Sequence, residues 1–170
     1  MNRSSFNRFA KNPVNLNIPR STFDRSFEHK TTFNTGDLIP IYMDEVLAGD
    51  TFKVDMSFVM RMTTPIHPVM DNSYLDVYFF YVPNRLIWTN YKKFFGENTD
   101  GYWYDSSEKE IPQIKFDQND NINHDSLLAY LGIPVCESSS GYNISSDIKI
   151  SQLPVRAYRL IWNEWFRDQN

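Results

Sequence analysis

The stretch that decides the fold is Thr51-Phe52-Lys53-Val54-Asp55-Met56-Ser57-Phe58-Val59-Met60-Arg61-Met62, in which apolar and polar side chains alternate. The even-numbered positions are all apolar, and the odd-numbered positions are polar except for Val59. Successive side chains of a β-strand point to opposite faces, so a period of two predicts a strand with one face toward a core and one toward water.

Further elements are predicted on both sides of this stretch. Residues 38–42 form a short extended run that Pro40 restricts to a sheet edge or a bulge. Residues 74–82 are apolar on both faces except at Asp76, which predicts a second, central strand. Apolar residues at helical spacing predict helices over 84–95 and 125–131, and a last helix that starts near Val155 and runs to residue 170. We expect an acidic loop over 97–123 and a Ser-rich loop over 136–150.

This inventory predicts a mainly β fold with helical insertions, but it is too short for a closed architecture. Three strands cannot complete a β-sandwich or barrel, and a jelly roll takes eight. We therefore expect the chain to be the first part of a longer polypeptide, with residues 31–170 as an incomplete β domain.

Composition excludes several classes of protein. The 170 residues include 13 Phe, 10 Tyr and 4 Trp but only 6 Gly, which suits a large core better than a glycine-rich cofactor cradle. A net charge of -4 excludes a uniformly basic nucleic-acid wrapper. The single cysteine, Cys136, excludes an intramolecular disulfide framework. No apolar run approaches the roughly 20 residues of a membrane span, and no signal-peptide pattern follows the N-terminal basic residues.

Residues 1–30 are predicted to form an extended basic arm without a core of its own. Up to residue 23 the segment has no acid and four basic residues, namely Arg3, Arg8, Lys11 and Arg20. Basic side chains neutralise phosphates and phenylalanines can stack on unpaired bases, so a nucleic-acid role is one interpretation. An ordinary solvated terminus is the other.

No metal-ligand pattern is complete. His29, His67 and His124 are far apart in the sequence, and none has a second ligand at zinc spacing. The acidic loop begins like a calcium loop at Asp117, but Ile122 stands where an EF-hand needs glycine. An irregular cation site in that loop stays open, because clustered carboxylates attract hard cations.

We likewise predict no catalytic residues and no cofactor. Glu108 and Glu110 are near neighbours in a polar loop that lacks the apolar pocket an acid catalyst needs. No nucleophile-elbow, phosphate-loop or dinucleotide-binding pattern occurs. No base or cationic pair near Cys136 in the sequence marks it as a nucleophile.

Several segments resemble the major capsid protein of the Microviridae, small single-stranded DNA phages, in particular its gokushovirus branch. They are SFEHKTTFNTGDLIP (26–40), YMDEVLAGDT (42–51), MRMTTPIHPVMD (60–71), FYVPNRLIW (80–88), LLAYLGIP (127–134), LPVRAY (153–158) and IWNEWFRDQN (161–170). The resemblance covers most of residues 23–170, and it is weakest in the acidic loop and over 136–150.

The resemblance implies a viral jelly-roll protein that is not an enzyme. Its partners would be copies of itself in a T=1 icosahedral shell, packaged single-stranded DNA and other virion proteins, with no membrane insertion. The implied location is the virion, assembled in the cytoplasm of a bacterial host. The arm residues Arg3, Arg8, Lys11 and Arg20 would then contact DNA or neighbouring subunits. A non-catalytic β-sandwich that binds carbohydrate or protein is the alternative, and it would be a monomer.

Overall fold

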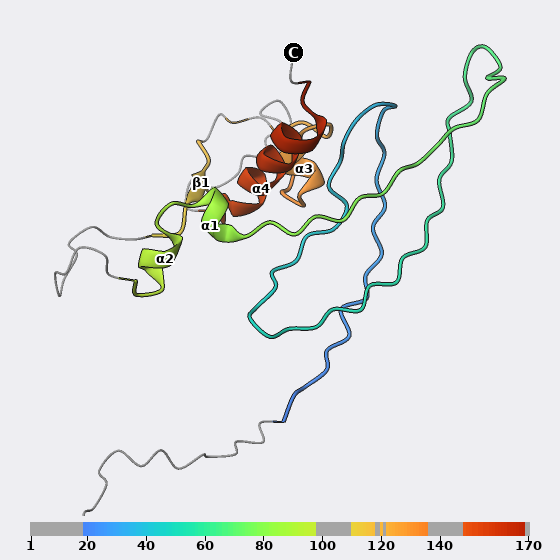
Figure 1. The fold of residues 1–170 in the computed structure, drawn as a ribbon. Helices are drawn as coiled ribbons and strands as arrows, with labels where there is room; N and C mark the ends of the chain where they lie inside the picture. The colour runs from blue at the N-terminus through green and yellow to red at the C-terminus, as the bar shows by residue number, and fades with distance from the viewer. Residues whose placement is uncertain (1–18, 98–109, 118–119, 121, 136–147, 169–170) are drawn as a thin grey trace, which may run out of the picture. The chain divides into compact units, whose positions relative to one another are not determined.

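A computed structural model describes residues 19–97, 110–117, 120, 122–135 and 148–168 (Figure 1). The chain divides into two units, Met1–Lys30 and Thr31–Asn170. The described part of the first unit, residues 19–30, contains no helix or strand and is exposed throughout. Every element described below belongs to the second unit.

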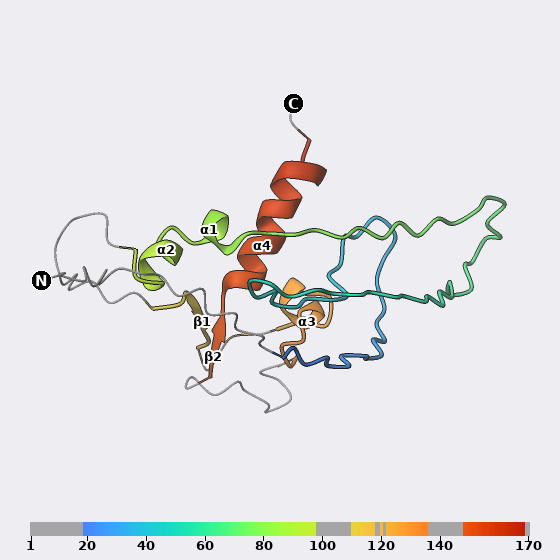
Figure 2. The same cartoon turned by 60° about the horizontal axis from the view of Figure 1, so that its bottom comes forward.

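The first half of the second unit is a long extended excursion. The two segments predicted as strands, 51–62 and 74–82, run outward and then back (Figures 1 and 2). Near the turn between them, the Ser73 hydroxyl lies 4.0 Å from the Met62 sulfur. Neither segment is hydrogen-bonded as a strand, so the prediction of strands is wrong for the described chain. The physical reason is that a strand exists only when a neighbour supplies the backbone partners of its N–H and C=O groups.

The alternation that motivated the strand prediction is nevertheless visible in the exposure of the side chains. Along 51–62, the apolar side chains of the even-numbered face are between 39% exposed at Phe52 and 55% exposed at Met62. Val59, on the other face, is fully exposed. The segment therefore keeps two distinct faces even without a sheet.

The predicted helix over 84–95 is two short helices, α1 (Asn84–Ile87) and α2 (Tyr91–Phe94). Between them, Trp88 has extended backbone angles and a side chain that is only 7% exposed. Its indole ring packs against the rings of Tyr91, at 6.1 Å, and Phe94, at 5.3 Å. The break in the helix thus turns Trp88 inward, where it anchors α2.

The two later helices were predicted, with different bounds. Helix α3 (Leu127–Tyr130) begins at Ser126, whose hydroxyl accepts the Ala129 N–H at 3.2 Å. Gly132, with a φ of 88°, follows its end. Helix α4 (Leu153–Ile161) continues into a π-helical segment, η2 (Trp162–Phe166). The C-terminal helix is therefore the longest regular element of the described chain.

A small antiparallel sheet joins the two segments predicted as loops. Strand β1 (Gln113–Lys115) pairs with β2 (Lys149–Ser151), with Ile114 opposite Ile150. Beside it lies a core of three buried residues, Phe116, Ile122 and Ile133. This is the only sheet within the described residues, so most of the predicted β structure is not formed there.

Candidate interaction surface

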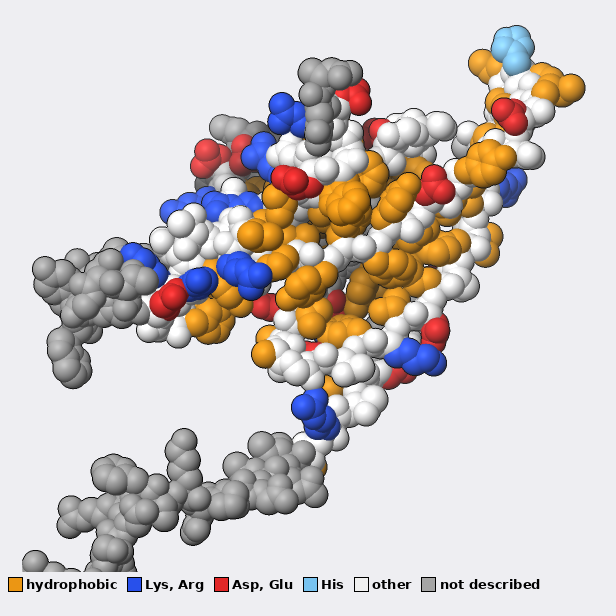
Figure 3. All heavy atoms as spheres, viewed as in Figure 1, with side chains coloured by type: hydrophobic (Ala, Val, Ile, Leu, Met, Phe, Trp, Pro, Cys, Tyr) orange, Lys and Arg blue, Asp and Glu red, His pale blue; other side chains and the backbone are white. Residues whose placement is uncertain are grey.

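The extended excursion presents a broad apolar surface. Figure 3 shows hydrophobic side chains gathered along it, with few charged groups between them. Its members are at least 39% exposed, and they include Phe52, Val54, Met56, Phe58, Met60, Met62, Leu75, Tyr78 and Phe79. Soluble monomers rarely expose a contiguous apolar patch of this kind, which typically marks an interaction site. We call residues 51–62 and 74–82 together the apolar excursion.

One face of the returning limb already has a partner in the C-terminal helix. The Tyr78 ring lies 5.5 Å from the Phe166 ring, and the Phe80 ring lies 5.9 Å from that of Trp165. On the other face, Phe79 and Tyr81 are 66% and 78% exposed. The limb therefore has one apolar face on a helix and a second one open, as expected for a strand in the middle of a layered fold.

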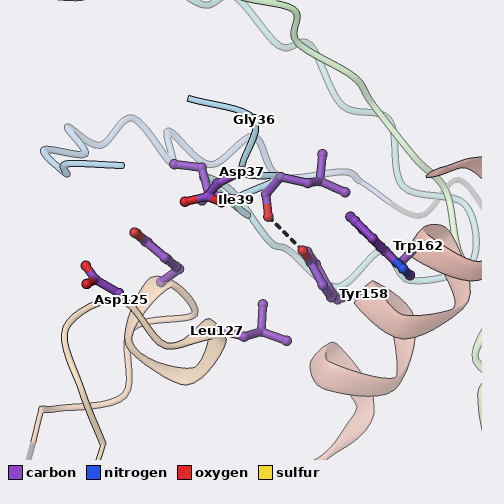
Figure 4. A pocket seen from close by; sticks show the side chains of 9 residues that line it. Gly36, Asp37, Ile39, Asp125, Leu127, Tyr158 and Trp162 are labelled. Atoms are coloured by element: carbon purple, nitrogen blue, oxygen red, sulfur yellow. Dashed lines mark hydrogen bonds between the residues drawn. The ribbon is translucent and has the colours of Figure 1, made fainter. Parts of the chain in front are cut away.

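Two tyrosines attach the start of this unit to its helices. The Tyr158 hydroxyl on α4 donates a hydrogen bond of 2.7 Å to the Leu38 carbonyl oxygen, marked by the dashed line in Figure 4. The Tyr130 hydroxyl on α3 donates one of 3.1 Å to the Thr32 carbonyl oxygen. Segment 32–38 is thereby held against both helices.

An open hollow of about 260 Å³ lies at these contacts (Figure 4). Its lining combines aliphatic and aromatic side chains with one glycine and two acids: Gly36, Asp37, Leu38, Ile39, Asp125, Leu127, Tyr130, Tyr158 and Trp162. Burial raises the pKa of Tyr158, and the negative charge of Asp37 adds to the effect. Burial also raises the pKa of Tyr130, with smaller contributions from Asp125 and Asp37. Both phenols therefore stay protonated, as hydrogen-bond donors, beyond the usual range.

Arg156 links α4 to α1. Its Nη1 donates to the Ile87 carbonyl oxygen at 3.1 Å. Its Nη2 and Nε donate to the Gln152 side-chain oxygen at 2.8 and 3.1 Å. The hydrogen bonds of Arg156, Tyr130 and Tyr158 to distant carbonyl oxygens could not be predicted from the sequence. They join residues 69 to 120 positions apart, and such contacts leave no local pattern.

The arm residues predicted to contact DNA or subunits are mostly outside the described chain. Arg3, Arg8 and Lys11 lie outside the described residues, and Arg20 is described and exposed.

The residues considered for metal binding or catalysis are placed only in part. His29, His67, His124 and Glu110 are exposed, while Glu108 and Cys136 lie outside the described residues. Within the described ranges, no group of three or more potential ligating side chains comes together. None of the helices described is long and apolar enough to cross a membrane.

The apolar excursion is broad and exposed, and it is attached to short helices. Such a surface is typical of the class of proteins that make extended contacts with further polypeptide. Comparison with known families gives this class a name. Residues 13–170 match the family described as Capsid protein (F protein), and the chain belongs to this family.

Three curated relatives agree with this assignment. The chain is 40% identical to the capsid protein VP1 of Bdellovibrio phage phiMH2K over 99% of its length. It is 38% identical to the capsid protein VP1 of Chlamydia phage 1 over 96% of its length, and 37% identical to that of Spiroplasma virus 4 over 90%. It covers 29%, 26% and 26% of these three relatives. The predicted resemblance to the Microviridae capsid protein is confirmed.

Proposed function

We propose that the protein is a structural, non-enzymatic capsid subunit that assembles with copies of itself into a phage shell. The observation that carries this proposal is the family match over residues 13–170, together with relatives that are all named capsid proteins. The alternative of a carbohydrate- or protein-binding module draws no support from these names.

The fold we propose is an eight-stranded jelly roll, of which this chain supplies the first part. In it, residues 51–62 and 74–82 become strands when neighbouring strands supply the missing backbone partners. Two observations support this. The two faces of 51–62 differ in exposure, and the limb 74–82 already packs one apolar face on Trp165 and Phe166. The low helix content and the small antiparallel sheet are consistent with part of such a β fold.

The shell we propose is a T=1 icosahedron in the virion, assembled in the cytoplasm of a bacterial host and enclosing single-stranded DNA. A closed symmetric shell requires each subunit to present extended faces that are buried only on assembly. The support for a shell is the family assignment and the three relatives named capsid protein. Other virion proteins are further expected partners.

For the N-terminal arm we propose a place on the inner side of the shell or across a neighbouring subunit. The support is its composition, four basic residues and no acid before Asp24. Weak phosphate contacts become effective when many copies act together. Changing Arg3, Arg8, Lys11 and Arg20 to Gln tests this. Lower DNA content supports a DNA contact, failed assembly with normal DNA binding supports a subunit contact, and no change contradicts both.

The shell proposal itself is tested by electron microscopy of the purified full-length protein with two matched variants. Phe58→Asp places a charge on the apolar face of 51–62, whereas Val59→Asp places it on the fully exposed face. We expect closed particles for wild type and Val59→Asp, and none for Phe58→Asp. Closed particles of normal size from Phe58→Asp would contradict the proposed burial of this face in the jelly-roll core.

A further inference from the structure

We propose that the surface formed by α1 and α2 binds single-stranded nucleic acid, with Arg85 and Lys92 facing phosphates and Phe95 stacking on a base. The inference rests on the proposed shell function in one respect: the single-stranded nucleic acid is taken to be the packaged DNA. It concerns a different part of the chain from the N-terminal arm.

The first observation is a short basic stretch between two acidic ones, residues 31–83 and the acidic loop over 97–123. Residues 84–97 contain three basic side chains, Arg85, Lys92 and Lys93, against one acid, Glu97. Residues 31–83 contain two basic and seven acidic side chains. Figure 3 shows several Lys and Arg side chains, with Asp and Glu side chains among them, over the part of the second unit that holds α1, α2 and α4. Within an acidic chain, this is a place where an anion is attracted.

The second observation is a set of packed aromatic rings in and next to α2, the helix that carries Lys92 and Lys93. Phe95 is 70% exposed, and its ring lies 4.9 Å from Tyr91 and 5.3 Å from Phe94. Phe94 and Tyr91 in turn pack on the buried ring of Trp88. Phe95 is thus supported from behind and open in front, which is the arrangement of a stacking platform.

The basic groups are accessible to a phosphate. Arg85 is exposed in the last turn of α1. Lys92 pairs with Glu97 at 3.9 Å, and both side chains are well exposed. An exposed pair of this kind is weak, so a phosphate can replace the carboxylate.

The combination of basic side chains with an exposed aromatic ring favours a nucleic-acid strand over a protein as the partner of this surface. The apolar excursion is equally rich in exposed aromatics, but its two basic residues, Lys53 and Arg61, are balanced by two acids, Asp55 and Asp76. Basic groups beside an exposed ring bind the backbone and the face of an unpaired base at once. A duplex keeps the faces of its bases stacked, so the surface selects a single strand.

The test is fluorescence anisotropy of labelled oligothymidylate with purified protein over a series of salt concentrations. The variant Arg85→Gln/Lys92→Gln is compared with Lys53→Gln/Arg61→Gln, which removes the same two charge types from the apolar excursion. Each phosphate contact contributes about 0.7 to the log–log salt slope for single strands. We expect the first variant to make the slope shallower by roughly 1.4 and the second to leave it unchanged.

Stacking is tested separately with Phe95→Leu against Phe79→Leu, a residue of similar exposure. We expect Phe95→Leu to weaken oligothymidylate binding roughly fivefold or more at every salt concentration without changing the slope. Arg85→Lys/Lys92→Arg is expected to keep binding, which separates loss of charge from loss of folding.

The inference is overturned if the α1–α2 variants bind like wild type or if the control variants lose as much affinity. It is also overturned if only the four-residue arm variant weakens binding. If the α1–α2 variants bind DNA normally but no longer form particles, the surface is a protein contact. Normal particles from a wild-type protein that does not bind oligothymidylate refute this inference alone, whereas DNA binding without particles refutes the shell proposal alone.

Discussion

The phenol of Tyr158 and the backbone carbonyl of Leu38, 120 residues apart in the chain, are joined by a hydrogen bond of 2.7 Å. Leu38 begins the short extended run that leads into the apolar excursion, and Tyr158 lies in the middle of the longest helix. This contact therefore fixes where the excursion leaves the helical part of the unit.

Removing this hydrogen bond tests its contribution to stability. In Tyr158→Phe, the Leu38 carbonyl loses its donor while the ring is kept, so we expect a loss of about 1 kcal/mol in the free energy of unfolding. Urea denaturation measures it. Tyr74→Phe, at an 81% exposed position, is the control and should change stability by less than about 0.5 kcal/mol. Equal effects of the two substitutions would show that the bond to Leu38 contributes nothing.

The raised pKa of Tyr158 predicts a dependence on alkaline pH. Because the folded state holds the phenol proton above the ordinary pKa of 10.0, the stabilisation is complete below that value. It is lost as the pH rises through the higher folded pKa, since the unfolded chain releases the proton first. We expect the stability difference between wild type and Tyr158→Phe to be constant up to about pH 9 and to shrink above about pH 10. A difference that grows with pH would contradict this assignment.

Arg156 is expected to matter more than an exposed arginine. Arg156→Met keeps much of the apolar stem but removes the bonds to Ile87 and Gln152. Hydrogen bonds to charged groups contribute about 1.5–3 kcal/mol, and the half-buried position places the expected loss at the lower end. Thermal unfolding of this variant is compared with Arg61→Met, which should be near wild type. A wild-type unfolding midpoint for Arg156→Met would rule out a structural role for the link between α4 and α1.

Phe58 should report the difference between these 170 residues and the full-length protein. Complete removal of a buried phenylalanine ring costs roughly 3–5 kcal/mol. Phe58 is 47% exposed in the chain, so Phe58→Ala should cost less than about 2 kcal/mol there. In the full-length protein, where the remaining strands are proposed to cover this face, we expect the full cost, measured as a lower denaturant midpoint. The same small cost in both proteins would mean that the remaining strands do not bury this face.

The helices were the most predictable part of the fold because their signals are local. Ser126 and Gly132 mark the ends of α3 by a side-chain cap and a left-handed backbone, and both can be read from neighbouring residues. The split between α1 and α2 was not predictable, since the break at Trp88 depends on which rings its indole contacts.

The strands were less predictable than the helices, because strand pairing depends on distant segments. The period of two in 51–62 correctly indicated two different faces, but pairing depends on partners that no local pattern specifies. The sequence did not predict strands β1 and β2, because each has only three residues and lies in a polar segment. The contacts of Tyr130, Tyr158 and Arg156 depend on distant backbone carbonyls, so only the folded chain reveals them.

Assembly is tested most directly by the size of the purified full-length protein in solution. Sedimentation velocity at neutral pH should show large closed particles, or their oligomeric intermediates, in place of a single chain. A monodisperse monomer over a wide range of concentrations, with no larger species, would contradict the central claim that this protein is a capsid subunit.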